Sequence, residues 1–484
     1  MKNLIYTLLI ASLLYTSCDK YLDVEPRSQI ELDKLYKEEK GFQDALSGIY
    51  ILMKHEDSYG ARMTQTTVEN LISNWDVTAG TVEQKLGLFS YTDADVDKAL
   101  SAIFSKQYAT IASVNALLNN IDERKSVFKT EGLYNLIKGE ALAIRAYVHL
   151  DILRLFGPIP TSPAEGSRLA YVTQFSKAIN AHVEFEEYKK MLLKDIEEAT
   201  ALLKEVDPIL HYSVSELREP NRVGGGGYRA ENDFFAYRTL RMNYYAVRAL
   251  EARAQLWFGN KEQAYIASKE VIGAVNNNNS PKFRLGSSSD MNAGDYVLRE
   301  EHIFGLYDRA MFDWFGMRYS NGVLKKGTTV TLIKNTLFGN TNTDIREQSL
   351  WILNTLSNGA KAHVIRKYEA KDPKTVSMNT DYKQIPMLRM SEMYLIAAET
   401  TSFTEGITLL KEFRDTRSLK LTNPSNDLEL KREIIKEYRK EFYAEGQGFF
   451  NYKRNNVAKA DFLFIPNAAT INYVLPLPKV EPVK

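Results

Sequence analysis

The chain has 484 residues, of which 44% are hydrophobic and 25% are charged, so it carries enough apolar material to bury a substantial core. Its 62 basic and 61 acidic side chains nearly cancel, which leaves a formal net charge of +1 and no basic stripe. Electrostatic capture of nucleic acid is therefore excluded from the expected functions, because it needs concentrated positive charge. The length fits two or three average domains, or one large domain with insertions.

The first 17 residues have the order of a secretory signal peptide. Lys2 gives a short basic start, residues 4–14 are mostly Leu, Ile, Ala and Tyr, and the small residues Thr16 and Ser17 follow. The apolar run is too short to cross a bilayer, which takes roughly 20 apolar residues. Residues 1–17 are therefore predicted to direct export and to be removed.

Cys18, the single cysteine of the chain, comes directly after these small residues. This position resembles the cleavage box of bacterial lipoproteins, in which the cysteine becomes the new first residue and is acylated. A lone thiol in an exported protein has no disulfide partner, and lipidation gives it a role. The alternative is an ordinary signal peptide followed by an incidental cysteine. We expect lipidation at Cys18 and an extended tether over residues 18–30, so that a lipid holds the protein to a membrane.

Most of the remaining chain is predicted to be helical. Over residues 95–121, apolar side chains recur at three- and four-residue steps, which places them on one helix face. These are Leu100, Ile103, Phe104, Tyr108, Ile111, Val114 and Leu118. A second helix is expected over residues 133–156, ending before Gly157-Pro158 because proline disfavours helical geometry in the residue before it. A third, amphipathic helix is expected over residues 185–203.

Residues 244–271 give the strongest local signal. Alanines and leucines mark two short helical segments, and Gly259-Asn260 breaks the pattern between them. The spacing is that of a tetratricopeptide-like helical hairpin, and residues 388–398 and 407–413 repeat it less clearly. One such hairpin cannot bury both of its faces, so several must stack.

The predicted fold class is therefore mostly α, a tetratricopeptide-like helical-repeat scaffold with inserted irregular loops and a few short strands. We expect an N-terminal helical part over residues 31–271 and a C-terminal part over residues 272–484, with a loop-rich insertion and closing helices.

The stretch from residue 296 to about 384 lacks helical periodicity. Its apolar runs are short, at 303–304, 330–333 and 364–365, and Gly, Asn, Asp and Thr separate them. This composition predicts loops with a few short strands, and the four glycines at 224–227 predict a further surface loop. Binding function tends to lie in such segments when a rigid scaffold holds them.

Several blocks of the chain, in order, resemble the SusD/RagB family of outer-membrane lipoproteins that capture nutrients. The stretch 139–146 continuing to 155–160 is similar to the family's signature helix, and most of the mature chain is covered by further matches. These are the spaced residues Phe104, Tyr108, Ile111 and Asn115, the hairpin 241–272, the helix 385–399, Arg414, Arg417, and the blocks 439–442, 445–446, 452–454 and 475–478. Charged residues one turn apart in these blocks, such as Glu437 and Lys440, can pair locally or bridge to neighbouring helices. We therefore expect the motif residues to determine the fold rather than to contact ligand.

No catalytic constellation is found, and the protein is not expected to be an enzyme. The six histidines are scattered without a His-x-x-x-His pair, and the glycine run lacks the Lys-Ser/Thr of a phosphate loop. A Gly-x-Ser-x-Gly nucleophile elbow is also missing from the sequence. Two carboxylates would suffice for a glycosidase, so that alternative stays open. Neither a cofactor nor a metal site is predicted.

Two clusters combine the residue types that a sugar site needs, aromatic faces together with amide, carboxylate or guanidinium groups. The first is Asn74, Trp75 and Asp76, in a polar segment where the resembled family places ligand loops. The second is Trp314, Arg318 and Tyr319, in the densest aromatic cluster of the irregular segment. We predict both as ligand-binding, with packing in the core as the alternative for each tryptophan. Trp257 and Trp351 are expected to be core residues.

The resemblance implies a surface-exposed outer-membrane lipoprotein that binds a nutrient, most simply an oligosaccharide. It further implies a TonB-dependent SusC-like transporter as partner, with the protein lying as a lid over the barrel. Three alternatives stay open: the same fold binding peptides, a surface glycosidase, and a scaffold that only assembles partners.

Overall fold

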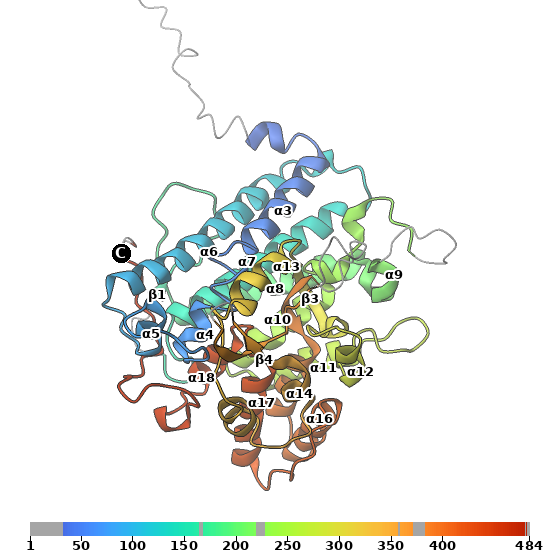
Figure 1. The fold of residues 1–484 in the computed structure, drawn as a ribbon. Coiled ribbons are helices and arrows are strands. Elements are labelled where there is room, and N and C mark those ends of the chain that lie inside the picture. The colour runs from blue at the N-terminus through green and yellow to red at the C-terminus, as the bar shows by residue number, and fades with distance from the viewer. Residues whose placement is uncertain are drawn as a thin grey trace, which may run out of the picture.

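The computed structural model describes residues 32–163, 168–218, 228–356, 359–370, 383–479 and 481. The predicted signal peptide, the whole predicted tether with Cys18, and the four-glycine run lie outside these residues. Helices dominate the described part, and its strands are short (Figure 1). The predicted mostly α class is confirmed.

The helices, in chain order, are α3 (Glu39–Met53), α4 (Thr67–Leu71), α5 (Val82–Gly87), α6 (Ala94–Ile121), α7 (Leu133–Phe156), α8 (Phe185–Val206), α9 (Val214–Arg218), α10 (Tyr244–Trp257), α11 (Lys261–Ile272), α12 (Ser288–Asn292), α13 (Met311–Phe315), α14 (Ile345–Leu350), α15 (Met390–Thr400), α16 (Phe403–Thr416), α17 (Asp427–Glu441) and α18 (Gln447–Arg454). The strands are β1 (Arg168–Leu169), β2 (Val183–Glu184), β3 (His302–Tyr307), β4 (Trp351–Thr355), β5 (Lys361–Ile365) and β6 (Gln384–Arg389). The three long N-terminal helices that the periodicity predicts are present, with boundaries within three residues of those expected.

Helix α7 is the centre of the N-terminal part. It packs against α6 and α8, and most of its residues are buried on every side. This explains why its apolar residues do not form a single stripe, since a helix covered all round has no polar face. Gly139 permits the close approach of α8, because a Cβ there would lie 2.8 Å from Cγ of Leu203.

The helical hairpins continue from this layer toward the lower end of the molecule in Figure 1. Helix α10 packs against α11, α11 against α15, α15 against α16, and α16 against α17. Gly259 makes the turn between α10 and α11 with a φ of +78°, a conformation that glycine adopts without steric cost. Stacking of these hairpins buries faces that one hairpin would leave in water, as the tetratricopeptide-like pattern predicts.

The irregular segment leaves the scaffold between two paired strands. β3 and β6 are antiparallel neighbours, with Leu306 opposite Ile385, so residues 308–383 form an excursion that starts and ends at one place. Within it β4 and β5 form an antiparallel pair. The apolar run at 330–333 contributes to a π-helical turn, η8 (Thr331–Leu337), rather than to a strand.

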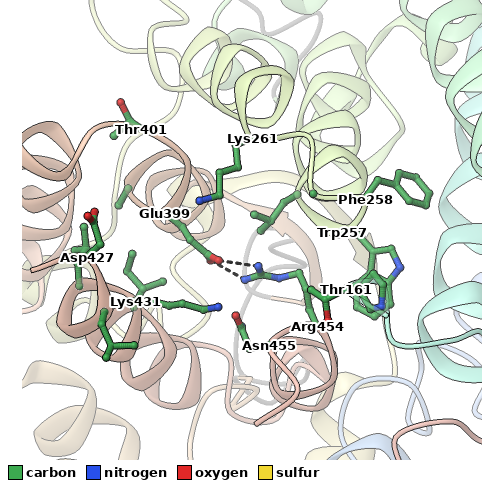
Figure 2. Close-up of a pocket in the computed structure, with 17 residues that line it drawn as sticks. Thr161, Trp257, Phe258, Lys261, Glu399, Thr401, Asp427, Lys431, Arg454 and Asn455 are labelled. Atoms are coloured by element: carbon green, nitrogen blue, oxygen red, sulfur yellow. Dashed lines mark hydrogen bonds and ion pairs between the residues drawn. The ribbon is translucent and has the colours of Figure 1, made fainter. Parts of the chain in front are cut away.

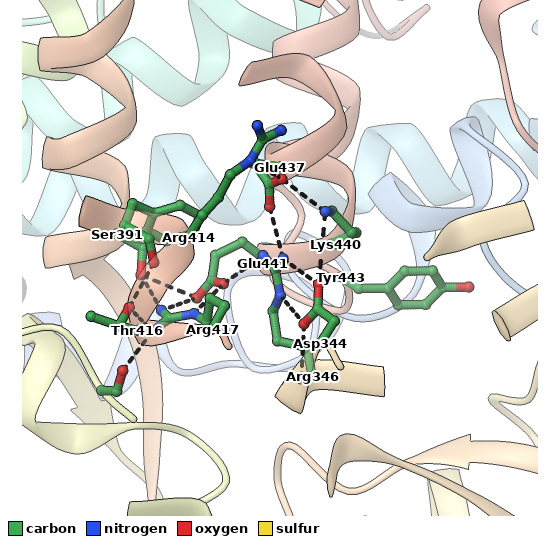
Figure 3. A network of polar contacts seen from close by, with 12 residues as sticks. Asp344, Arg346, Ser391, Arg414, Thr416, Arg417, Glu437, Lys440, Glu441 and Tyr443 are labelled. Atoms are coloured by element: carbon green, nitrogen blue, oxygen red, sulfur yellow. Dashed lines mark hydrogen bonds and ion pairs between the residues drawn. The ribbon is translucent and has the colours of Figure 1, made fainter. Parts of the chain in front are cut away.

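A buried ionic network joins the closing helices to this excursion (Figure 3). Glu441 of α17 accepts hydrogen bonds from Arg346 at 3.1 Å, Arg389 at 2.9 Å and Arg417 at 2.9 Å. Burial alone would raise the pKa of Glu441, but Arg417 and Arg389 outweigh it and hold that pKa well below its usual range. Glu437 likewise pairs with Lys440 one turn away, at 2.8 Å. The charged motif residues of these blocks therefore hold elements together, as expected from their spacing.

Candidate functional site

The two clusters predicted as ligand-binding lie together, although more than 230 positions separate them in the sequence. Trp75 meets Tyr319 edge-on, with ring centroids 5.9 Å apart. Both contact Gln65: Trp75 Nε1 donates to its carbonyl oxygen at 2.7 Å, and Tyr319 Oη donates to its Oε1 at 3.2 Å. Arg318 donates from Nη1 to the same Oε1 and to the carbonyl of Gly60. The loop after α3 thus packs against the π-helical turn η7 (Gly316–Ser320), and we call this contact between the two clusters the joint.

The aromatic side chains of this joint are buried. Trp75 is 2% exposed and also contacts Tyr443, with centroids 5.1 Å apart. Trp314 is 5% exposed, and its Nε1 donates to Asp308 Oδ2 at 2.9 Å. Tyr319 is fully buried. Each indole is therefore placed as a packing residue, the alternative that the sequence left open, and direct ligand contact by these rings stays a prediction.

Asn74 is tied to the C-terminal part of the chain. Its Nδ2 donates to Glu69, and its carbonyl accepts a hydrogen bond from Tyr443 Oη. The other carboxylate oxygen of Glu69 accepts from the backbone N–H of Gly446 at 2.8 Å. Gly446 has a φ of +74°, and a Cβ there would lie 1.9 Å from the carbonyl oxygen of Met63. Only glycine allows these two backbones to approach so closely.

Burial raises the pKa of Glu69 from its ordinary 4.5 to about 7, although the hydrogen bonds from Asn74 and Gly446 and the charge of Lys367 oppose this rise. The joint therefore contains a carboxyl group that is partly protonated at neutral pH.

Asp76 and Arg318 reach the edge of the joint, where their side chains are half-buried. Asp76 Oδ2 accepts from the N–H of Gly327 at 2.6 Å, and its Oδ1 lies 3.4 Å from Lys326 Nζ. The guanidinium of Arg318 lies 5.0 Å from the ring centre of Trp314. These two residues present a carboxylate and guanidinium donors beside aromatic surface.

A hollow of about 300 Å³ lies next to the joint. Its lining includes Tyr50, Ile51, Lys54, Tyr237, Leu240, Arg241, Leu306 and Tyr307. Lys54 Nζ lies 3.7 Å from Asp308 Oδ1, and Asp308 is the residue that accepts the hydrogen bond from Trp314. The hollow and the joint are therefore connected through Asp308.

Sequence reasoning did not identify the residues of this hollow. They come from α3 and its C-cap, from the two caps and the last residue of the 3₁₀ turn η5 (Arg238–Leu240), and from β3. Tyr237 is the residue most suited to ligand contact, because it is 39% exposed and holds a φ of +52°. A non-glycine residue in this region is uncommon and concentrates at binding sites. No local motif marks it; only the three-dimensional placement does.

The groups at this site are ring faces, a carboxylate, a guanidinium and an ammonium group, which can contact a ligand through apolar surface and hydrogen bonds. Across the described ranges, no group of three or more His, Cys, Asp or Glu side chains is placed to hold a metal ion.

His149, within α7, stacks on Tyr171 with ring centroids 3.9 Å apart. Burial lowers the pKa of His149 to about 3, so it stays neutral as a packing residue. The helices of the described residues include none long and apolar enough to cross a bilayer.

Two family models match the chain. A model described as "Starch-binding associating with outer membrane" matches residues 20–213, and one described as "SusD family" matches residues 317–473. The first contains Asn74, Trp75 and Asp76, and its end lies shortly before Tyr237. The second contains Arg318, Tyr319 and the closing helices. Together the two models cover more than two thirds of the chain.

Known proteins resemble the chain in sequence and in fold. SusD-like protein P25 of Formosa agariphila is 26% identical over 163 residues, which are 32% of this chain and 30% of that protein, so the match spans under a third of the relative's length. A SusD superfamily protein of Bacteroides thetaiotaomicron has a TM-score of 0.66 at 20% identity, covering 89% of this chain and 92% of that one. A SusD-like carbohydrate binding protein of Bacteroides vulgatus has a TM-score of 0.63 at 19% identity, covering 86% and 83%. At these identities the solved structures show a shared fold. The two family models show that the chain belongs to the SusD/RagB family.

Proposed function

We propose that the protein is a surface-exposed outer-membrane lipoprotein that binds an oligosaccharide and delivers it to a TonB-dependent SusC-like transporter. One observation carries the proposal. The family model described as starch-binding and outer-membrane-associating matches the segment that supplies Asn74, Trp75, Asp76 and the α3 side of the hollow. The anchor is the lipid on Cys18, and no covalent step on the ligand is involved.

The binding surface in this proposal runs from Asp76 and Arg318 to the hollow beside Asp308. Asp76 and Arg318 meet sugar hydroxyls, and Tyr237 and Tyr307 offer ring faces to the apolar C–H surface of the sugar. Asn74, Trp75, Trp314 and Tyr319 lie behind them and hold the two loops in register. Rigid positioning of this kind limits the ordering cost of binding, which supports affinity without a deep cavity.

The proposal is tested by calorimetry of the full chain, purified in detergent, against soluble neutral oligosaccharides and peptides. Two variants leave the buried rings in place, Tyr237→Asn and Arg318→Met, of which the second also removes the hydrogen bonds from Arg318 to Gly60 and Gln65. Asparagine is chosen at position 237 because it tolerates positive φ. Matched controls are Tyr212→Asn, at a tyrosine of similar exposure outside the hollow, and Arg309→Met, at an exposed arginine on the neighbouring loop.

We expect saturable oligosaccharide binding that weakens about tenfold in each test variant, because each loses roughly the free energy of one ring or charged contact. The controls should bind as the unchanged chain does. Binding to peptides alone would mean that the ligand is a peptide and not an oligosaccharide. Release of shorter products from a polysaccharide would indicate a glycosidase. Equal affinity in all four variants would place the site elsewhere.

The location is tested separately through Cys18. The Cys18→Ala variant should lose incorporation of labelled palmitate and should no longer remain with outer membranes or co-purify with a SusC-like barrel. Retention of label in this variant would contradict lipidation at Cys18.

A further inference from the structure

A second and larger cavity lies among the ends of the helical hairpins (Figure 2). Its volume is about 630 Å³, within the range typical of small-molecule sites. The walls are helix ends: the α10–α11 turn, the last turn of α15, the first two turns of α17, the end of α18, and the segment after α7. None of its lining residues lines the hollow beside Asp308.

The floor of the cavity is a buried ion pair. Arg454 of α18 donates from Nη1 and Nη2 to the two carboxylate oxygens of Glu399, at 2.7 and 2.6 Å. The side chains of the pair are 12% and 10% exposed. Because both oxygens of Glu399 are occupied by the guanidinium, this pair is a fixed and nearly neutral base for the cavity.

Two lysines at the cavity add positive charge that the acidic residues of its lining do not fully neutralise. In Figure 2, Lys261 and Lys431 reach toward the Glu399–Arg454 pair from opposite sides. Both are exposed, and within the described part of the chain neither forms an ion pair. Asp427, the other acidic residue of the lining, offsets only one of them. The cavity therefore favours an anionic group held between the two ammonium groups.

The wall also contains polar atoms without partners. Asn455 Oδ1 is buried and accepts no hydrogen bond from any described residue, while its Nδ2 donates to the carbonyl of Asn451 at 2.9 Å. Trp257, which is 3% exposed, lines the same cavity, and its Nε1 is likewise buried without a partner in the described ranges. An unpaired buried polar atom is costly, and a bound hydroxyl can satisfy an acceptor or a donor.

We propose that this cavity is a second ligand site, for an acidic saccharide. The carboxylate or sulfate of one sugar unit lies between Lys261 and Lys431, and its hydroxyls pair with Asn455 Oδ1 and with Thr161 and Thr401 of the rim. Apolar side chains of Leu256 and Leu428 cover the C–H surface of the sugar. An acidic peptide would meet the lysines equally well, and its C=O and N–H groups can pair with the indole donor and the amide acceptor. The saccharide is favoured by the rim, where the apolar Leu256 and Leu428 stand beside the hydroxyls of Thr161 and Thr401, and tetraglutamate tests the peptide.

The test is calorimetry on the full chain in detergent with six named probes. Two are acidic, tetragalacturonate and a sulfated galactan tetrasaccharide, and one is their neutral counterpart, galactotetraose. Sodium sulfate and galacturonic acid separate a simple anion and a free acidic sugar from an oligosaccharide, and tetraglutamate represents an acidic peptide. The test variant is Lys261→Met with Lys431→Met. The control is Lys98→Met with Lys194→Met, which makes the same change of charge at two exposed helical lysines outside the cavity.

We expect saturable binding of at least one acidic saccharide, tetramer or monomer, and weaker binding of sulfate. Affinity should fall on the order of tenfold in the Lys261/Lys431 variant and stay unchanged in the control, since each exposed charge contact contributes modestly. Equal affinity for sodium sulfate would reduce the cavity to an anion site and overturn the saccharide assignment. Three other results would overturn the proposal. They are binding of tetraglutamate alone, acidic-saccharide binding that both double variants retain, and no heat of binding from any acidic saccharide.

Because the hollow beside Asp308 shares no residue with this cavity, Tyr237→Asn should leave acidic-saccharide binding intact. The two proposals can therefore fail independently.

Discussion

Glu69, in α4, is the buried carboxyl that connects Asn74 of the joint to Gly446 after α17. Its carboxyl group is buried and accepts hydrogen bonds from Asn74 and from the N–H of Gly446. Lys367 is the cation whose charge lowers the pKa of this carboxyl group. Three tyrosines of the excursion and the closing segment lie around it, Tyr319, Tyr368 and Tyr443. The charge of Glu69 adds to burial in raising the pKa of each, so the three phenols stay neutral. One charged lysine among neutral phenols does not offset the cost of burying the carboxylate.

This environment predicts a pH dependence of stability. The pKa of Glu69 rises from 4.5 to about 7 on folding, so between these values the folded chain binds a proton that the unfolded chain has released. Stability from this group is therefore complete below about pH 4.5 and is lost as pH rises through about 7, an effect on the order of 3 kcal/mol. Glu69→Gln should remove this fall, measured as the difference in unfolding free energy between pH 5 and pH 8.

The matched control is Glu83→Gln, on the surface of α5, which should leave the dependence unchanged. If the unchanged chain and Glu69→Gln give parallel curves across this range, the carboxyl is ionised in the folded protein throughout.

Trp75 and Trp314 show what the sequence can and cannot reveal at this scale. Their residue types and polar neighbours indicate a functional region, and the structure brings the two clusters into one joint. Their burial depends on Tyr319, Tyr443 and Asp308, of which only Tyr319 belongs to a predicted cluster. Exposure of an aromatic side chain is set by such distant neighbours, so local composition predicted the region but not which of its atoms face solvent.

At the scale of elements, the helices were predictable where burial follows a regular period. Helix α6 carries its apolar residues on a stripe, and Gly259-Asn260 ends α10 by local chemistry, so residue types alone place both. The π-helical turns η7 and η8 have no comparable signal. Their geometry depends on packing, such as that of Tyr319 beneath Trp75, between elements that are distant in sequence.

The ionic network around Glu441 connects four elements, α17, α14, β6 and α16. Glu441 contacts three arginines, from α14, from the end of β6 and from the end of α16, and all are at most 3% exposed. Glu441→Gln should lower the unfolding free energy by about 3–5 kcal/mol, because it leaves buried positive charge without its partner. Denaturant unfolding followed by circular dichroism measures this loss.

The surface pair Lys411–Asp415, with an Nζ–Oδ2 distance of 2.6 Å, provides the comparison. Asp415→Asn should cost less than about 1 kcal/mol, since both side chains are exposed. A similar small effect of Glu441→Gln would mean that the arginines find other acceptors and that the network is not cooperative.

At the scale of the whole molecule, the chain crosses several times between its two predicted parts. Helix α11 of the first part packs on α15 of the second, and Tyr147 of α7 donates to the carbonyl of Met387 in β6. Arg253 of α10 donates to both carboxylate oxygens of Glu392 in α15, at 2.7 and 2.6 Å. One hydrophobic core runs through residues of both parts, from Tyr36 to Leu475. These contacts favour a single cooperative unit, although a smaller cluster of buried residues between Leu395 and Phe442 belongs to the second part alone.

A cut in the chain tests this. Residues 277–279 form an exposed turn just after α11, where a protease site can be inserted without removing a buried contact. We expect the cut protein to elute as one species and to unfold in one transition, because the contacts of Arg253 and the shared core persist after cleavage. Each fragment expressed alone should show no cooperative transition. It would carry one member of the Arg253–Glu392 pair without its partner, and its share of the common core would be exposed to water. A sigmoidal thermal transition from residues 31–271 alone would instead make the boundary at 271 one between independently folding domains.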